Sequence, residues 1–285
     1  CDVAIIPITT ALYRLPPPSY LAAYTFFLKQ AEKLDRDTLR GQLTLAGYTH
    51  VTQVVSPGEY SVRGGLIDLF PMGSALPYRI DLLHDEIESI RTFDVDTQRS
   101  VYPVNEIRLL PAREFPLDKD GQERFRRNFR ERFEGDPSKS RLYKDVSQGL
   151  APAGIEYYLP LFFDDTATLF DYLPQQAVLC LHRDVTASME NFWRDTQSRY
   201  ELLRGDRDRP LLPPQELFLG VDRFFAGCKA FPRIEIAAGE NTGAVQCATA
   251  SLPPVAVDRR DENPVSKFAQ FVNTFSGRIL LRAES

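Results

Sequence analysis

The sequence predicts an α/β protein that also contains a small α+β domain, with the start of a further α/β domain near its C-terminal end. Two continuous apolar runs, Val3 to Ile8 and Ala177 to Leu181, are typical of strands buried on both faces of a parallel sheet. Helix-like patterns alternate with such strands, which favours a largely parallel sheet. Between the two runs, one helix and the short strands that follow it form a compact α+β unit of about 80 residues, the size of a small domain.

Composition limits the classes of function. The chain has 285 residues with 43% apolar and 26% charged side chains, which is typical of a globular protein of one to three domains. Its net charge of −5 argues against a dedicated nucleic-acid binder, which is usually basic, so any contact with DNA would need a local patch. No apolar run reaches the roughly 20 residues that a membrane span requires.

The cysteines and the chain start point to a reducing compartment and a longer parent protein. Cys1, Cys180, Cys228 and Cys247 contain no CxxC pair, so neither a zinc site nor a disulfide framework is indicated. This usage fits a cytoplasmic location, and no signal peptide is visible. The chain opens on an apolar run without a starting methionine, so we expect it to be part of a longer protein.

The first third of the chain carries recognisable helix and strand signals. Asp35 is placed to cap a helix over Arg36 to Ala46, with Gly47 as its C-terminal stop. The segment Tyr60 to Phe70 predicts a strand interrupted at Gly64-Gly65 by a β-bulge or a close backbone approach. Further predictions are a helix at 9–15 and strands at 24–28, 78–83 and 87–93.

Later elements are predicted in the same way. Gly121 to Phe133 and Thr186 to Leu203 have helical periodicity. Gln215 to Phe225 predicts a short helix and a strand. Residues 237–264 have the composition of a linker, and Pro264 to Leu281 predicts a helix followed by a strand.

Sequence motifs for catalysis are absent. The chain contains no GxxxxGK[ST] phosphate loop, no GxGxxG after a strand and no GxSxG elbow. His50, His84 and His182 have no second histidine or cysteine at metal-ligand spacing. We therefore expect no catalysis by this chain itself.

Two segments are candidates for DNA contact. One is the arginine run of the helix at 121–133, and the other is an aromatic cluster near residue 160. The arginines have interleaved glutamates, which also suits a solvated helix face, and the aromatic residues equally suit a core. The residues are Arg124, Arg126, Arg127, Arg130 and Arg132, and Tyr157, Tyr158, Phe162 and Phe163.

The strand at 78–83 indicates a protein-binding surface. Strand periodicity places Tyr78, Ile80 and Leu82 toward the core and Arg79, Asp81 and Leu83 on the opposite face. Arg63 and Glu59 reach the same surface if the strands pair. An apolar side chain beside arginines is typical of protein interfaces, although a solvated face with weak ion pairs has the same pattern.

Three segments carry a family resemblance. GEYSVRGGLIDLFPMG, LPYRIDLLHDEIESIRTFDVDTQRS and PAGIEYYLPLFF closely resemble the bacterial transcription-repair coupling factors. A looser pattern, GE[FY]xVRGxxIDIFP, is shared with the excision-repair protein UvrB, whereas LFPMGS, FDVDTQRS and RPLLPPQ favour the coupling factor. The resemblance runs essentially from residue 1 to residue 285.

The resemblance implies a UvrB-like domain 1, with a parallel sheet and split into 1a and 1b, around an inserted domain 2. Domain 1a would end at residues 1–28, domain 2 would span 29–111, domain 1b 112–240, and a linker with the start of domain 3 would occupy 241–285. In the family, domain 2 binds UvrA. Carried over by motif, the UvrA-binding residues are Arg63 and Arg79, with Leu83 at a position that is aromatic in the family and Glu59 and Asp81 as weaker acidic positions.

The resemblance also implies the setting of the longer protein. The family is an ATP-dependent DNA translocase that displaces stalled RNA polymerase, and a C-terminal domain covers domain 2. RNA polymerase, double-stranded DNA, ATP and Mg²⁺ would therefore be bound outside this chain, for which no cofactor is expected. Two other functions stay open: a UvrB-like module that binds damaged DNA, and an ATPase, against which the missing phosphate loop argues.

Overall fold

The computed structural model describes residues 3–206, 208–237, 244–245, 253, 255–257 and 263–279. The chain divides into two compact units, Cys1–Ala237 and Ala238–Ser285. In the second unit the described residues contain one helix, α9 (Ser266–Thr274), which confirms the helix predicted there. The strand predicted to follow it ends outside the described residues.

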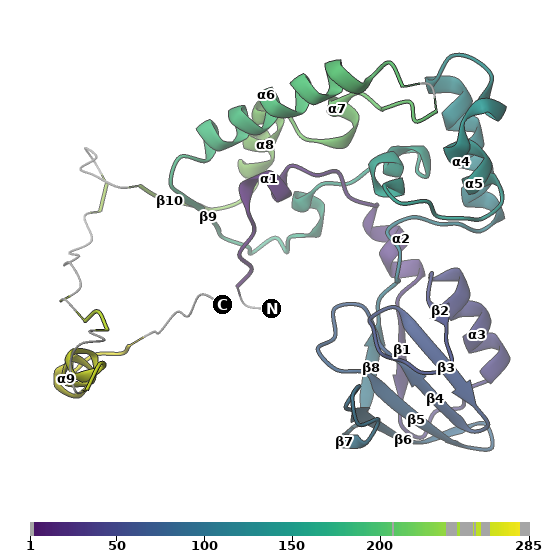
Figure 1. Ribbon diagram of the computed structural model, residues 1–285, viewed down its shortest axis with the longest axis horizontal. Helices are drawn as coiled ribbons and strands as arrows, with labels where there is room; N and C mark the ends of the chain where they lie inside the picture. The colour runs from purple at the N-terminus through teal and green to yellow at the C-terminus, as the bar shows by residue number, and fades with distance from the viewer. Residues whose placement is uncertain are drawn as a thin grey trace. The chain divides into compact units, whose positions relative to one another are not determined.

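A six-stranded sheet forms one body of the first unit, which is drawn with its strands labelled in Figure 1. Its strand order is β2-β3-β4-β5-β6-β7, in which β2 runs parallel to β3 and every later pair is antiparallel. A separate antiparallel pair joins β1 (Phe26–Lys29) to β8 (Glu106–Leu109). The six strands are β2 (Thr49–His50), β3 (Glu59–Arg63), β4 (Leu66–Leu69), β5 (Tyr78–Leu83), β6 (Glu86–Phe93) and β7 (Ser100–Val104).

One face of this sheet packs against helix α3 (Arg36–Leu45) and the β1–β8 pair. Leu39 and Leu43 of the helix are buried together with Ile67, Ile80 and Ile90 of the strands. The alternation predicted for residues 78–83 is therefore confirmed, because Ile80 is fully buried while Leu83 is exposed. We call this body, from β1 to β8, the sheet domain.

Helix α3 begins and ends as the sequence predicts. The Asp35 carboxylate accepts a hydrogen bond from the Thr38 backbone N–H at 2.7 Å, which satisfies a free donor of the first turn. Gly47 follows the helix with a φ of +89°, a conformation that favours glycine. A Cβ on Gly47 would also collide with the side chain of Arg113, so both conformation and packing require glycine.

The Gly64-Gly65 pair is the turn of a hairpin between β3 and β4, and the predicted bulge at this position is wrong. Arg63 pairs directly with Leu66 across the turn, and Gly64 has a φ of +61°. The alternative of a close backbone approach is confirmed, since a Cβ on Gly65 would lie 2.8 Å from the Leu82 carbonyl oxygen. Register shifts of the sheet lie instead between Asp81 and Leu82 in the β5–β6 pairing and between Arg91 and Phe93 in the β6–β7 pairing.

The remainder of the first unit is mainly helical. A first core combines Phe125 and Phe129 of α4 with Phe162 and the segment η2. A second core joins α1, α6 and α8 around Leu12 and Met189. The helices are α1 (Ile8–Ala11), α2 (Pro18–Ala23), α4 (Lys119–Arg132), α5 (Arg141–Ser147), α6 (Val185–Leu203), α7 (Pro214–Leu217) and α8 (Val221–Cys228), with 3-10 turns η1 (Pro137–Lys139), η2 (Ile155–Leu161) and η3 (Leu169–Tyr172).

Several elements differ from the sequence-based expectation. The strand predicted at Val3 to Ile8 is wrong: residues 3–7 are in no strand of the described structure, Ile8 begins α1, and Ile5 is 95% exposed. The strand predicted in Gln215 to Phe225 is replaced by α7 and α8. The strand near residue 180 exists as β9 (Leu179–His182), but it is partly exposed, and within the described residues its one strand partner is β10 (Arg233–Ile236), which runs parallel to it. The described structure is therefore a mixed α/β fold.

The sheet domain should fold by itself, because its core is built from residues 28–109 with partly buried neighbours from 24 to 112. We expect a fragment of residues 24–117 to unfold cooperatively in urea when followed by circular dichroism. Leu43→Ala should lower its free energy of unfolding by about 2–5 kcal/mol. The matched change Leu45→Ala, at a site 53% exposed in the same helix, should alter it by less than about 0.5 kcal/mol. Equal effects of the two changes would contradict the assigned core.

Burial of Tyr48 should make the protein less stable at alkaline pH. Burial raises the pKa of Tyr48 to about 12 from 10.0, and its hydroxyl donates to the Leu110 carbonyl oxygen at 2.7 Å. The unfolded chain then loses this proton before the folded one, so the stabilisation is complete below pH 10 and is lost as the pH rises to 12. The loss is on the order of 2–3 kcal/mol. Urea denaturation from pH 8 to 12 should show that the free energy of unfolding falls less steeply with pH in Tyr48→Phe than in the wild type. The same fall in both proteins would contradict this account.

Candidate functional site

The five predicted partner-binding residues lie on one face of the sheet, opposite α3. The strand register aligns Ser61, Asp68, Arg79 and Arg91 in one row across β3, β4, β5 and β6. The next row contains Arg63, Leu66, Asp81 and Ser89. Glu59 and Leu83 alternate onto the same side. We call this side of the sheet, which no helix of the sheet domain covers, the open face.

A buried carboxylate connects the two predicted arginines. The side chain of Asp68 is 1% exposed and accepts three hydrogen bonds from guanidinium groups. Arg79 donates from Nε to Oδ1 at 2.7 Å and from Nη2 to Oδ2 at 3.0 Å. Arg63 donates from Nη2 to Oδ2 at 2.6 Å. Such charge-assisted, two-pronged contacts are the strongest hydrogen bonds available to side chains.

The Arg79 guanidinium contacts Gln98 and Phe93 as well as Asp68. Its Nη1 donates to the Gln98 carbonyl oxygen at 2.9 Å, and its guanidinium lies 4.8 Å from the centre of the Phe93 ring. The hydrogen bonds to Asp68 raise the pKa of Arg79, against the opposing effect of its burial. Only 15% of the side chain is exposed. Arg79 therefore ties β5 to β4 and to the turn between β6 and β7.

Arg63 and Leu83 are the accessible members of the predicted set. The Arg63 side chain is 51% exposed, and only one of its N–H groups bonds to Asp68. Leu83 is 57% exposed. Arg91 is a further exposed arginine on this face, directly opposite Arg79, and it forms no ion pair within the described part of the chain. An exposed leucine on the same face as exposed arginines suits the binding of another protein.

The two acidic residues of the predicted set have local partners. Glu59 accepts backbone N–H groups of Val55 and Ser56, both at 2.9 Å, and so closes the turn before β3. Asp81 accepts a hydrogen bond from the Ser89 hydroxyl on the neighbouring strand at 3.0 Å. Both contacts are those of ordinary turn and strand structure, and both carboxylates remain partly accessible.

Sequence reasoning missed Asp68, which organises the site. The signal was available in VRGGLIDLF, since glycine pairs between apolar strands are typical of two-residue hairpin turns. With the turn at Gly64-Gly65, Asp68 falls on the same face as Arg63 and diagonal to it. Reading the glycines as a bulge concealed this relation.

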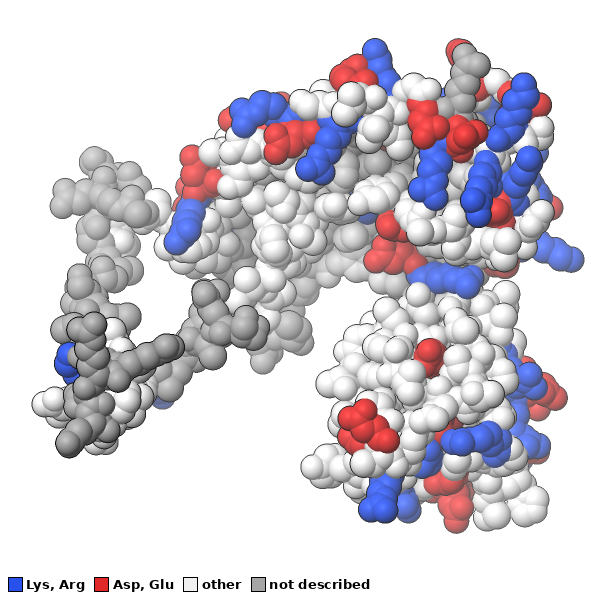
Figure 2. Space-filling model, viewed as in Figure 1, with Lys and Arg blue, Asp and Glu red and all other residues white. Residues whose placement is uncertain are grey.

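The arginine run on α4 is largely paired within the protein. Arg124 and Arg127 lie 3.8 Å and 3.2 Å from Asp164, and Arg126 lies 4.0 Å from Glu123. Arg132 contacts Glu216 at 2.9 Å, and Arg130 donates to the Tyr143 hydroxyl at 2.8 Å. Figure 2 shows basic and acidic side chains intermingled over the region of α4 and α5. This pattern is typical of a solvated helix face and offers no continuous basic stripe for a phosphate backbone.

The aromatic cluster belongs to the core. Tyr158, Phe162 and Phe163 are buried, and Phe162 stacks near Phe115 and Phe125 with ring centres 4.7 Å and 5.0 Å apart. Of the four residues, Tyr157 alone is exposed. Three of the four rings are therefore unavailable for stacking on nucleic-acid bases.

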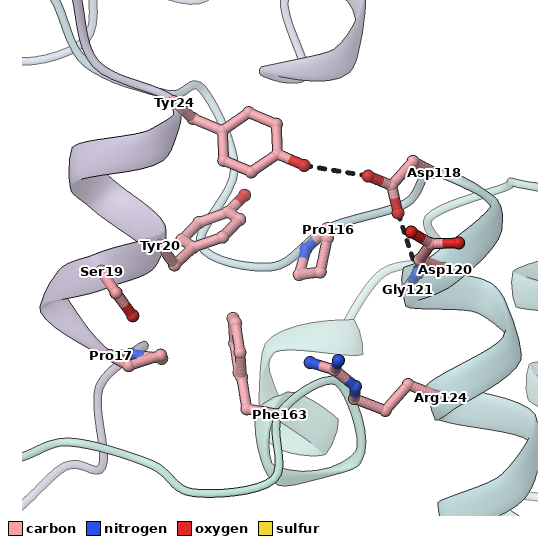
Figure 3. Close-up of a pocket in the computed structure, with 10 residues that line it drawn as sticks. All are labelled: Pro17, Ser19, Tyr20, Tyr24, Pro116, Asp118, Asp120, Gly121, Arg124 and Phe163. Atoms are coloured by element: carbon pink, nitrogen blue, oxygen red, sulfur yellow. Dashed lines mark hydrogen bonds between the residues drawn. The ribbon is translucent and has the colours of Figure 1, made fainter.

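A cleft of about 300 Å³ lies between α2 and the first turns of α4. Figure 3 shows Tyr24 bonded to Asp118 on its upper side and Arg124 directed toward Phe163 below. The Tyr24 hydroxyl donates to Asp118 Oδ2 at 2.9 Å, while Asp118 Oδ1 caps α4 through the Gly121 N–H. Asp120 and Arg124 place opposite charges on the rim, so the cleft favours no single ligand charge.

The described residues show neither a membrane-spanning helix nor a metal-binding cluster. Within the described ranges no helix has the length and apolar character needed to cross a lipid bilayer. The same residues contain no group of three or more histidine, cysteine or acidic side chains arranged to bind a metal ion. The open face is therefore the candidate site with the clearest chemistry.

Comparison with known proteins identifies a domain family that covers the sheet domain. Residues 26–115, which contain the sheet domain, match the family described as the UvrB interaction domain. The chain is 44% identical to the transcription-repair-coupling factor of Escherichia coli (strain K12) over 292 residues and 43% identical to that of Haemophilus influenzae over 289 residues, in each case across 99% of the chain. It spans 25% of the length of each of these two relatives. A more distant relative from Bacillus subtilis is 28% identical over 63% of the chain and 16% of its own length. The family recognised from the sequence is confirmed: the chain is similar to a quarter-length segment of a transcription-repair-coupling factor and carries a UvrB interaction domain.

Proposed function

We propose that this chain is the module of a transcription-repair coupling factor that recruits UvrA, and that it does so through the open face of the sheet domain. The observation that carries the proposal is that the family match at residues 26–115 coincides with the domain whose uncovered face presents Arg63 and Leu83. A module that binds a protein needs no catalytic group, in keeping with the absence of catalytic motifs in the sequence.

The chemistry of the open face specifies what UvrA must offer. Arg63 and Arg91 are exposed guanidinium groups that would pair with carboxylates. Leu83 would be desolvated beside them in an apolar depression. The part-buried Arg79 would contribute through its remaining N–H groups and by supporting its neighbours. Glu59 and Asp81 would add weaker contacts at the edges.

The activity of the longer protein belongs to the same proposal. We infer that RNA polymerase, double-stranded DNA, ATP and Mg²⁺ are bound by segments outside this chain, which spans only 25% of the closely similar relatives. A C-terminal domain would cover the open face until activation, and the cytoplasm would be the site of action. DNA binding by this chain is the weaker alternative, because its arginines are paired and its aromatic rings are buried.

Arg63→Ala should weaken the binding of UvrA at least tenfold, because loss of an interfacial arginine that pairs with a carboxylate costs about 2–5 kcal/mol. Leu83→Phe should retain or increase affinity, and Leu83→Asp should abolish it. The measurement is isothermal titration of UvrA into the 285-residue chain. Arg108→Ala is the matched control, since Arg108 is exposed on β8 and contacts the Phe27 ring. Wild-type affinity for both Arg63→Ala and Leu83→Asp would exclude the open face as the UvrA site.

Arg79→Ala is expected to affect stability as well as binding, because most of the Arg79 side chain is buried against Asp68. Removal of one partner from a buried ion pair costs about 3–5 kcal/mol, whereas the exposed Arg63→Ala should cost less than about 1 kcal/mol. Urea denaturation of the two variants separates these effects. Wild-type stability of Arg79→Ala would show that its pair with Asp68 contributes nothing to folding.

A further inference from the structure

We propose that Asp68 is the positioning residue of the open face: it holds Arg63 in one preformed arrangement, so that a partner's carboxylate meets a guanidinium group that is already immobilised. The proposal rests on the proposed function for its consequence in binding. Its structural part, the immobilisation of Arg63 by Asp68, can be tested without any partner.

Burial makes Asp68 dependent on its arginines. A carboxylate that is 1% exposed would be strongly destabilising without compensating donors. Asp68 Oδ1 accepts a hydrogen bond from Arg79 Nε. Asp68 Oδ2 accepts hydrogen bonds from both Arg79 Nη2 and Arg63 Nη2. A partner cannot reach Asp68 itself, so any influence of this residue on binding must pass through the arginines.

Arg79 and Arg63 differ in burial and in the number of hydrogen bonds that they donate. Arg79 uses three of its five N–H groups, on Asp68 and on the Gln98 carbonyl, and is 15% exposed. Arg63 uses one and is 51% exposed. Arg79 is thus the rigid element that fixes the carboxylate, and Arg63 is the element with donors left for a partner.

The positive charge of Arg91 on β6 increases the need for the Asp68 carboxylate beside Arg79. Arg91 lies directly opposite Arg79 in the β5–β6 register, and like charges in this position repel. Asp68 offsets that repulsion from β4, on the other side of Arg79. The three arginines can therefore share one small surface, which gives the open face its preference for an acidic partner.

Immobilisation has a direct effect on affinity. A free arginine side chain carries rotamer entropy that is lost when a partner fixes it. Because the bond to Asp68 already restricts Arg63, less of this cost remains at the moment of binding. Loss of the Asp68 carboxylate should therefore weaken binding even though the exposed surface is chemically unchanged.

The first test follows Arg63 alone, by ¹⁵N relaxation of its Nε–H group in the 285-residue chain. Asp68→Asn should leave the Arg63 side chain markedly more mobile than in the wild type. Asp81→Asn is the matched control, since Asp81 lies on the same face but bonds to Ser89, and it should leave Arg63 unchanged. Equal mobility of Arg63 in the wild type and in Asp68→Asn would overturn the inference whether or not UvrA binds.

The second test measures UvrA affinity by titration well below the melting temperature of each variant. Asp68→Asn should bind at least fivefold more weakly than wild type, and in an Arg63→Ala background it should cause little further loss. Additive losses, or wild-type affinity for Asp68→Asn while Arg63→Ala binds weakly, would overturn the inference and leave the proposed function intact. Wild-type affinity for both Arg63→Ala and Leu83→Asp would instead refute the proposed function.

A further variant keeps the inference testable if Asp68→Asn does not fold. Asp68→Leu with Arg79→Met replaces the buried charges by apolar groups, a change that proteins often tolerate, and it leaves Arg63 and Leu83 in place. This double variant should fold cooperatively, show a mobile Arg63 and bind UvrA at least fivefold more weakly. An immobile Arg63 in this folded protein would overturn the inference.

Discussion

The hydrogen bonds between the Asp68 carboxylate and two guanidinium groups hold the open face together. They join β3, β4 and β5 from the side opposite the apolar core, and Arg79 extends the connection to the turn between β6 and β7. The apolar face of the sheet is stabilised by burial against α3. The open face has no covering helix, and it combines these paired charges with a small apolar cluster of Val54, Phe70 and Phe93. The side chains proposed for recognition therefore also contribute to stability.

The helical part uses its charges differently. Its arginines contact acidic or tyrosyl partners from other elements, such as Asp164 and Glu216, and its aromatic rings fill the core beneath them. A helix with five arginines resembles a nucleic-acid site in the sequence, but the charge it presents to solvent depends on acidic residues that are distant along the chain. Arg132 and Glu216, for example, are separated by 84 residues.

Local rules predicted much of the sheet domain. Capping by Asp35, the stop at Gly47 and the alternation along 78–83 each depend on neighbouring residues, and each was correct. The run at Val3 to Ile8 failed because an apolar stretch becomes a strand only where another strand pairs with it. Of the candidate site, the sequence predicted the face and its accessible residues. It did not predict that Arg79 is buried or that Asp68 links the arginines, since both follow from pairing across three strands.

The pairing of β1 with β8 determines how the sheet domain is attached. Phe26 lies opposite Leu109, so the chain enters and leaves the domain at neighbouring points, and Tyr24 packs against the cores on both sides of that junction. A domain whose two ends are adjacent can be removed from the surrounding chain, or inserted into another, without moving the residues on either side. The same geometry means that a pull on the open face is shared by two adjacent strands, which resist it together instead of one after the other.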